Sequence, residues 1–378
     1  VAISIAIVPF TIARYQAAGR AGPTTSQSGL NLYLGNNLQN PDPYYRPVPF
    51  ARSVPLLQAR EFNIEASRRA GKKLSPREAS SYWTREVIRM AIEQPSAFMR
   101  KIFQKILVFF NQFEAGDHYH IGFISDFVKF FKFPFLGLWL ILPFGMAGMA
   151  VNALRSRKLT ALSSVFGLYG LTLIIFFTNT RYRLPLLVIL IPFFVMGIGQ
   201  LISCIKERQF NKVFIYSSAI TIAFFIIEFL PVRGTNDMTA YYNTHAIILN
   251  SKGFEDEAIQ YWEKSSQMNK PFSAFANRQL AIIYLKKRDL KKTFYYLTKI
   301  PDDSFAAAMK YAMIGDIMVT QGQTKKAVAA YERSLEIHSG QRETRRKLVN
   351  ILWRIDKKRA KEEYDKLKYI SSFYDRGG

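Results

Sequence analysis

The stretch IGDIMVTQGQTKKAVAAYERSLEI, residues 314–337, carries a spacing of small and aromatic residues that recurs through the C-terminal part of the chain. One column of small residues has intervals of 35 and 34, and a second has intervals of 35, 34 and 33. The two columns are Ala246, Ala281 and Gly315, and Ala258, Thr293, Ala327 and Ala360. A larger residue follows each member of the second column by four positions: Trp262, Leu297, Tyr331 and Tyr364. A period of this length predicts stacked helix pairs, with small residues where the helices cross closely.

This pattern resembles the tetratricopeptide repeat, in which an aromatic residue fills the space beside the small ones. The glycines of SKGFEDEA and TQGQTKKA, Gly253 and Gly322, stand at the turn within a pair, where a positive φ is tolerated. The second repeat lacks this glycine, and the last, from about residue 341, is highly charged, as a terminal capping repeat would be. The resemblance implies an α-solenoid over 233–378 whose concave groove binds a peptide or a partner protein.

Apolar runs dominate the middle of the chain. Four runs are long enough for a membrane-spanning helix, after a partial one at 1–12. They cover about 133–153, 160–178, 184–204 and 213–231. The net charge of +24 sits largely beside these runs and no nucleic-acid module is present, so we expect membrane lipid and no nucleic acid as partner.

The fold class we predict is therefore mainly α, with a polytopic transmembrane bundle over 133–232. A loop region with an interfacial helix, 13–132, precedes the bundle, and the repeats follow it. The basic loops 153–159 and 205–212 favour the cytoplasmic side. This orientation puts the loop region and the repeats outside the cytoplasm of a bacterial inner membrane, with the repeats periplasmic.

The loop region contains clear helix signals. Ser75, Pro76 and Glu78 predict an N-cap, a first helical residue and a capping-box acid. Gly71 would end a preceding helix at about 58–70. A helix from Pro95 has apolar residues at helical spacing, interrupted by basic ones, and we expect it in the membrane interface with its lysines toward the head groups. An ordinary amphipathic core helix is the alternative.

Three further stretches are unusual, and together they carry a second resemblance. GLNLYLGNN, 29–37, alternates apolar and polar residues and then turns. KILVFFNQFEAGD, 105–117, ends an aromatic helix, and NTRYRLP, 179–185, begins a membrane helix with a proline in its first turn. In this order, and followed by the repeats, they resemble the C-terminal half of bacterial GT-C membrane glycosyltransferases of the protein-mannosyltransferase type, family 39-like.

That resemblance implies transfer of a sugar from a polyprenyl-phosphate donor to an acceptor outside the cytoplasm. The catalytic acid of such enzymes lies in the first external loop. Because the chain starts at Val1 within an apolar run, we expect that loop upstream in a longer protein. No catalytic residue is assigned in this chain, and we expect it to be inactive alone.

A clamp for the donor phosphate is the site we predict within the chain. Arginine at membrane depth offers a planar fork that matches phosphate oxygens. Arg181 and Arg183 would share one face if their loop is extended, with Tyr182 opposite and Lys105 as a third cation. The candidate supporting residues are Glu114, Asn111, Asn36 and Asn37.

Other chemistry has little support. The single Cys204 excludes a disulfide framework and a cysteine-based zinc site, and the histidines of DHYH, 117–120, are too few for a metal centre. No cofactor is assigned, and a divalent metal is left open without a site. Two alternatives remain: an O-antigen ligase or polymerase, and a non-enzymatic membrane-anchored repeat scaffold.

Overall fold

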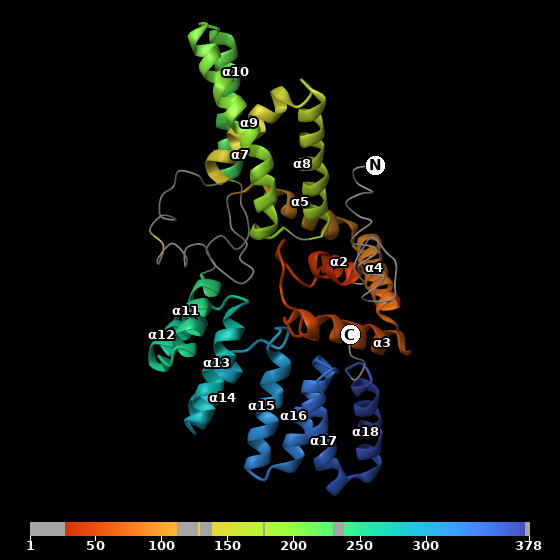
Figure 1. Cartoon of the computed structure of the whole chain (residues 1–378). Helices are drawn as coiled ribbons and strands as arrows, with labels where there is room; N and C mark the ends of the chain where they lie inside the picture. Colours follow the sequence, from red (N-terminus) through yellow and green to blue (C-terminus); the bar gives the residue numbers. More distant parts are fainter. Residues whose placement is uncertain (1–26, 112–127, 129–137, 177, 230–237, 375–378) are drawn as a thin grey trace.

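The computed structural model describes residues 27–111, 128, 138–176, 178–229 and 238–374, and for 55, 56, 138, 139, 180, 181 and 228 the backbone alone. Within these limits the chain forms sixteen helices and no strand, so the expected mainly helical fold is confirmed (Figure 1). The partial span predicted at 1–12 lies outside the described residues.

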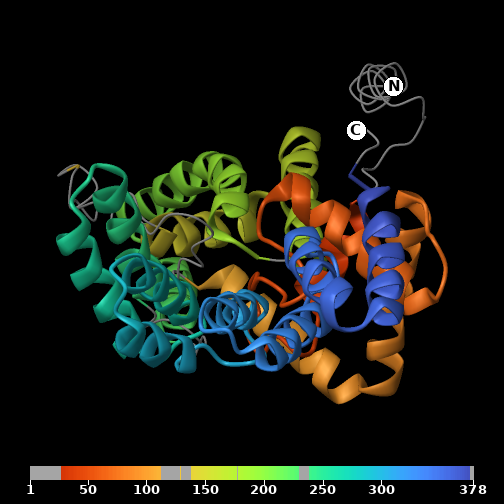
Figure 2. The ribbon, with the colours of Figure 1, turned by 90° about the horizontal axis from the view of Figure 1, so that it is seen from below.

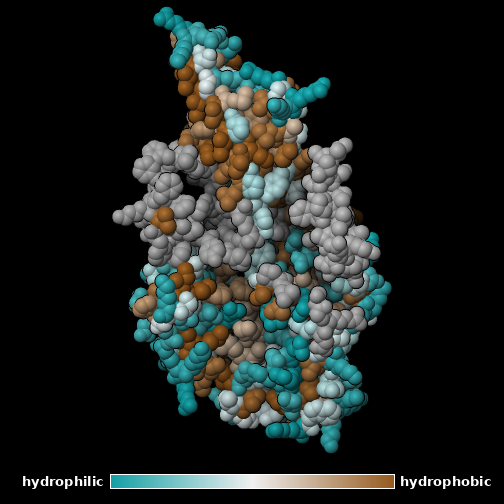
Figure 3. All heavy atoms as spheres, viewed as in Figure 1, coloured by the Kyte–Doolittle hydropathy of each residue, from teal (hydrophilic) through white to brown (hydrophobic). Residues whose placement is uncertain are grey.

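Four helices form the apolar bundle: α7 (Leu138–Asn152), α8 (Arg157–Ile175), α9 (Thr180–Lys206) and α10 (Phe210–Phe229). Three stretches, 157–175, 182–206 and 210–227, are long and apolar enough to cross a membrane. The described part of α7 is shorter, because the run predicted at 133–153 begins outside the described residues. Figure 3 shows a broad brown band over the bundle, below a hydrophilic end. Exposed apolar side chains such as Leu168, Val188 and Phe214 match a lipid environment.

The loop region contains α2 (Ser28–Asn36), α3 (Pro55–Ala70), α4 (Pro76–Glu93) and α5 (Pro95–Phe110). The predicted capping box is confirmed, since the Glu78 amide donates to Ser75 Oγ at 3.3 Å and the Ser75 amide donates to Glu78 Oε2 at 2.8 Å. Gly71 ends α3 with φ +66°. Buried Trp83 of α4 anchors the core of this region, and its indole N–H donates to the Phe62 carbonyl at 3.1 Å.

Two expectations for the loop region are wrong. Residues 28–36 form a helix rather than an alternating stretch with a turn, because Leu30, Tyr33 and Leu34 share a helical face and are all buried in the same core. The lysines of α5 do not face head groups: Lys101 and Lys105 are buried against neighbouring segments of the protein.

The repeats form four helix pairs after the bundle, and Figure 2 shows the pairs following one another in an arc. The helices are α11 (Thr239–Ser251), α12 (Glu255–Gln267), α13 (Ser273–Lys286), α14 (Leu290–Thr298), α15 (Ala307–Thr320), α16 (Thr324–Ile337), α17 (Arg342–Ile355) and α18 (Lys357–Ser371).

The columns read from the sequence are the contact points of these pairs. Every member of the second column is fully buried, and a Cβ on Gly315 would lie 2.5 Å from a ring carbon of Tyr331. Tyr364 is the exception among the larger residues, being 45% exposed, because α18 is the last helix of the array. At the turn of the second repeat, Arg288 adopts φ +59°, the left-handed conformation that glycine takes in the first and third repeats.

Candidate functional site

Three cations are buried where α2, α5, α8 and α9 meet: Lys101, Lys105 and Arg183. Each donates to backbone carbonyls at the end of another segment. Lys105 is 0% exposed, and its Nζ lies 2.8 Å from Asn36 Oδ1, 2.9 Å from the Phe176 carbonyl oxygen and 3.3 Å from that of Ile175. The amino group therefore binds the carboxyl end of α8, where the helix dipole is negative.

Arg183 acts in the same way on the carboxyl end of α5. Its Nη1 donates to the carbonyl oxygens of Val108 at 2.8 Å and Asn111 at 2.7 Å, and the residue is 3% exposed. Asn111 therefore contributes its backbone carbonyl to this contact. The first turn of α9 and the last turn of α5 are joined through one guanidinium.

Lys101 was not among the residues singled out from the sequence. Its Nζ lies 2.9, 2.5 and 3.0 Å from the carbonyl oxygens of Asn37, Asn40 and Asp42 in the segment after α2. Lys101 and Lys105 are four residues apart and so share one face of α5. The sequence signal for a joint role of the two lysines was this spacing, on a helix whose opposite face is apolar.

Burial acts on both amino groups. It lowers the pKa of Lys105 well below its usual range, with the charge of Lys101 adding to the effect. It lowers the pKa of Lys101 to about 8, against the opposing influence of the Asp42 carboxylate. The carbonyl oxygens around each amino group favour its protonated form, and so offset part of the cost of burial.

The predicted clamp residues have thus been brought together in part. Lys105, Arg183, Asn36, Asn37 and Asn111 gather within one cluster, although they come from stretches far apart in sequence. Lys105 and Arg183 bind oxygens of the protein itself, however, mostly backbone carbonyls, and both side chains are buried.

The extended loop expected around Tyr182 is wrong, because α9 begins at Thr180 and residues two apart do not share a helix face. Tyr182 itself packs at the edge of the apolar core of the bundle. Glu114 and the side chain of Arg181 lie outside the described residues.

A second candidate site is a groove on the inner side of the repeats. Its volume is about 1050 Å³, and it lies between α11, α13, α15 and α17 on one side and the segment 45–57 on the other. Residues at equivalent repeat positions line it in order: Ala240, Phe275, Met309 and Glu343. These four residues follow the same period as the small columns, which is the sequence signal that predicts a shared inner face.

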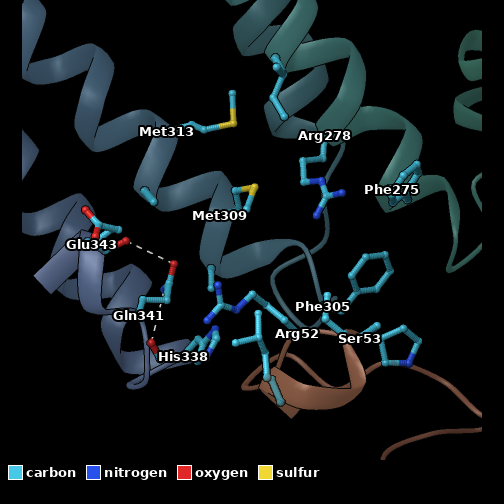
Figure 4. A pocket seen from close by; sticks show the side chains of 18 of the residues that line it. Arg52, Ser53, Phe275, Arg278, Phe305, Met309, Met313, His338, Gln341 and Glu343 are labelled. Carbon is cyan, nitrogen blue, oxygen red and sulfur yellow. Dashed lines mark hydrogen bonds between the residues drawn. The ribbon is translucent and has the colours of Figure 1, made fainter. Parts of the chain in front are cut away.

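The wall formed by segment 45–57 is fixed to the repeats by a buried polar junction. Glu61 of α3 accepts from the amide of Arg52 at 2.7 Å and from its Nε at 2.6 Å. His338, in the turn before α17, places Nε2 3.5 Å from Glu61 Oε2, and burial lowers its pKa. Figure 4 shows Arg52 from the segment and His338 from the repeats near each other at this end of the groove.

The floor of the groove carries one cation in an apolar setting. Figure 4 shows Arg278 of α13 pointing into the groove, with Phe275, Phe305 and Met309 around it. The guanidinium carbon lies 4.8 Å from the centre of the Phe275 ring. Burial lowers the pKa of Arg278, and no charged side chain in the described part of the chain opposes that shift.

Comparison with known proteins identifies the class of the C-terminal domain. Residues 251–353 match the family described as tetratricopeptide repeat-like domain, which confirms the repeats predicted from the sequence. The match leaves the apolar bundle and the loop region outside it. No curated protein matches the chain.

Proposed function

We propose that this chain is a membrane-anchored protein whose repeats hold an extended polypeptide segment in the groove facing segment 45–57. One observation carries the proposal: a groove of about 1050 Å³ runs along equivalent positions of successive repeats in a domain that matches a repeat-like family. Repeat arrays present extended concave surfaces of this kind to their partners.

The lining suits a polypeptide. Phe275, Phe305 and Met309 offer apolar contacts, while Gln341 and Asn243 add polar side chains to the lining. Apolar contacts with a few placed polar groups are typical of binding sites, and the volume lies at the upper end of the range for small-ligand pockets. An extended chain of several residues would fill it.

Hydrogen exchange with and without a bound chain tests this proposal. The probe is a permanently unfolded polypeptide, reduced and carboxymethylated lactalbumin, added to the protein in lipid nanodiscs. We expect slower exchange in α13, α15 and segment 45–57, and no change in α14 or α16 on the outer side. Protection confined to the outer helices, or none at saturating probe, would refute the proposal.

A second candidate function is that of the glycosyltransferase resemblance: the full-length protein would transfer a sugar from a polyprenyl-phosphate donor to an acceptor outside the cytoplasm. The observation that favours it is convergence. GLNLYLGNN, KILVFFNQFEAGD and NTRYRLP contribute Asn36, Lys105 and Arg183 to one cluster at the end of the apolar bundle. In this proposal the cluster positions the start of α9, and Arg181 is the arginine that contacts the lipid phosphate.

Donor binding by the full-length protein tests this second proposal. Because Arg183 binds backbone oxygens, its removal would mix folding with ligand binding, and Arg181→Gln is the cleaner change. The matched control is Lys158→Gln in the first turn of α8. We expect the first variant to bind a polyprenyl-phosphate sugar more weakly and the second to bind it normally. Equal binding would refute the clamp, and absence of sugar transfer by the full-length protein would refute the enzyme.

The placement of the repeats outside the cytoplasm of a bacterial inner membrane belongs to the same proposal. A membrane-anchored scaffold without enzymatic activity agrees equally with the groove. In that case the polypeptide held by the repeats would be a binding partner rather than an acceptor of sugar.

A further inference from the structure

Arg278 is unlike the other cations of the groove. Arg52 pairs with Glu61, and Lys347 places Nζ 2.7 Å from Asp316 Oδ1. Arg342 is exposed, with its guanidinium over the Tyr374 ring, whereas Arg278 is half-buried. In the described part of the chain no acidic side chain contacts Arg278, and its buried Nε has no hydrogen-bond partner. The residue is half-buried, so its unpartnered Nε is desolvated while the side chain as a whole borders the groove.

The charge of the groove as a whole has the same sign. Four basic residues line it against two acidic ones: Arg52, Arg278, Arg342 and Lys347, with Asp316 and Glu343. Both acids have basic partners, because Asp316 pairs with Lys347 and Glu343 with Arg346. The groove is thus complementary to a chain that brings a negative charge to its floor.

The surroundings define what that charge must be attached to. Phe275 stacks beneath the guanidinium, and Phe305 and Met309 stand beside it (Figure 4). A carboxylate accepts two parallel bonds from an arginine fork, and such a pair gains strength where water is excluded. Apolar side chains on either side of the carboxylate would cover the aromatic rings.

We propose that the groove selects extended segments in which a carboxylate, paired with Arg278, is flanked by large apolar side chains that contact Phe275, Phe305 and Met309. The proposal rests on the polypeptide-binding function proposed above and adds the chemistry of the bound segment. The carboxylate is either an acidic side chain or the end of the chain.

Selection from a random decapeptide library on phage, against the whole 378-residue chain in nanodiscs, provides the test. The most enriched sequences are then made as peptides with Glu, with Gln in its place, and with a free or an amidated carboxyl end. We expect enrichment of acidic residues beside Phe, Leu or Met. The Glu-to-Gln change should weaken binding about tenfold to a hundredfold, as for a charge-assisted hydrogen bond.

Two protein variants assign the effect to one residue. Arg278→Gln should bind the Glu and Gln peptides equally, whereas the matched control Lys347→Gln should keep the preference because that lysine already has a partner. Should the free carboxyl end, and not Glu, carry the preference, the ligand is a chain terminus. The comparison of the Glu and Gln peptides uses the wild-type protein alone, so it does not depend on whether either protein variant folds.

The possible results distinguish a failure of the Arg278 proposal from a failure of the proposed polypeptide-binding function. Peptides that bind in the groove without any acid preference would overturn the role of Arg278 and leave the groove as a polypeptide site. An acid preference that survives in Arg278→Gln would overturn it too. No selectable binding at all would overturn the proposed function, and this inference with it.

Discussion

Replacing Lys105 with methionine removes the amino group at the centre of the buried cluster while keeping most of the side-chain volume. Three oxygens lose a donor: Asn36 Oδ1 and the carbonyls of Ile175 and Phe176. The Ile175 oxygen keeps a second donor, Asn36 Nδ2 at 2.8 Å. Asn36 Oδ1 and the Phe176 carbonyl oxygen are therefore the two buried acceptors for which Nζ is not replaced by this second donor.

The size of the effect follows from those two acceptors. A buried acceptor left unsatisfied costs about 1–3 kcal/mol. Part of this loss of stability is offset, because the variant no longer buries a charged amino group, which burial disfavours. We expect a net loss of about 2–3 kcal/mol in the free energy of unfolding, a drop in Tm of roughly 4–10 °C.

Thermal unfolding in nanodiscs, with hydrogen exchange as the local readout, measures this change. Exchange at the end of α2 and the end of α8 should rise in Lys105→Met, because these are the segments the amino group joins. The matched control is Arg100→Met, an exposed residue on the same helix, which should stay within about 0.5 kcal/mol of the wild type. Equal stability of the two variants would refute the structural role of Lys105.

Three further predictions concern pH, backbone strain and orientation. The pKa of Lys101 in the folded chain, about 8, lies below the usual lysine pKa of 10.5, so the unfolded chain binds more protons between these two pH values. The free energy of unfolding should therefore rise by about 3 kcal/mol from pH 8 to pH 10.5 relative to Lys101→Met. A pH dependence that is the same for the two proteins would contradict this. Arg288→Gly should raise the stability of the repeats by about 0.5–1 kcal/mol, because glycine accepts φ +59° without strain, and urea unfolding in which this variant is no more stable than wild type would count against it. A reporter fused after Gly378 that is active only in the cytoplasm should stay silent. An active reporter would contradict the proposed placement of the repeats outside the cytoplasm.

The repeats were predictable because their signal is local and periodic. Small residues at intervals of 33 to 35 predict where helices cross, and Ala258, Thr293, Ala327 and Ala360 are indeed fully buried. The capping box at Ser75 was predictable for a similar reason, since both of its partners lie within one helical turn.

The buried cations were not predictable in the same way. Lys105 appears in the sequence as a charge that interrupts an apolar helix face, which suggests exposure. Its partners, Asn36 and Phe176, lie 69 and 71 residues away, so only the tertiary structure shows that carbonyl oxygens receive the amino group. Arg278 is an intermediate case: the repeat period places it on the inner face, but the absence of an acidic neighbour among the described residues needs coordinates.

Filling the groove tests the central claim most directly. Ala312 of α15 lines the groove, whereas Ala329 of α16 is exposed on a helix that does not line it. Replacing each with tryptophan makes a pair of variants with the same change in volume and different positions. Binding of fluorescein-labelled carboxymethylated lactalbumin is measured by anisotropy for both variants and the wild type.

We expect Ala312→Trp to weaken binding at least about tenfold, because the new side chain occupies the space of the bound chain. Ala329→Trp should bind as the wild type does. Equal affinities for the two variants, with both folded, would contradict the claim that the repeats hold a polypeptide in this groove.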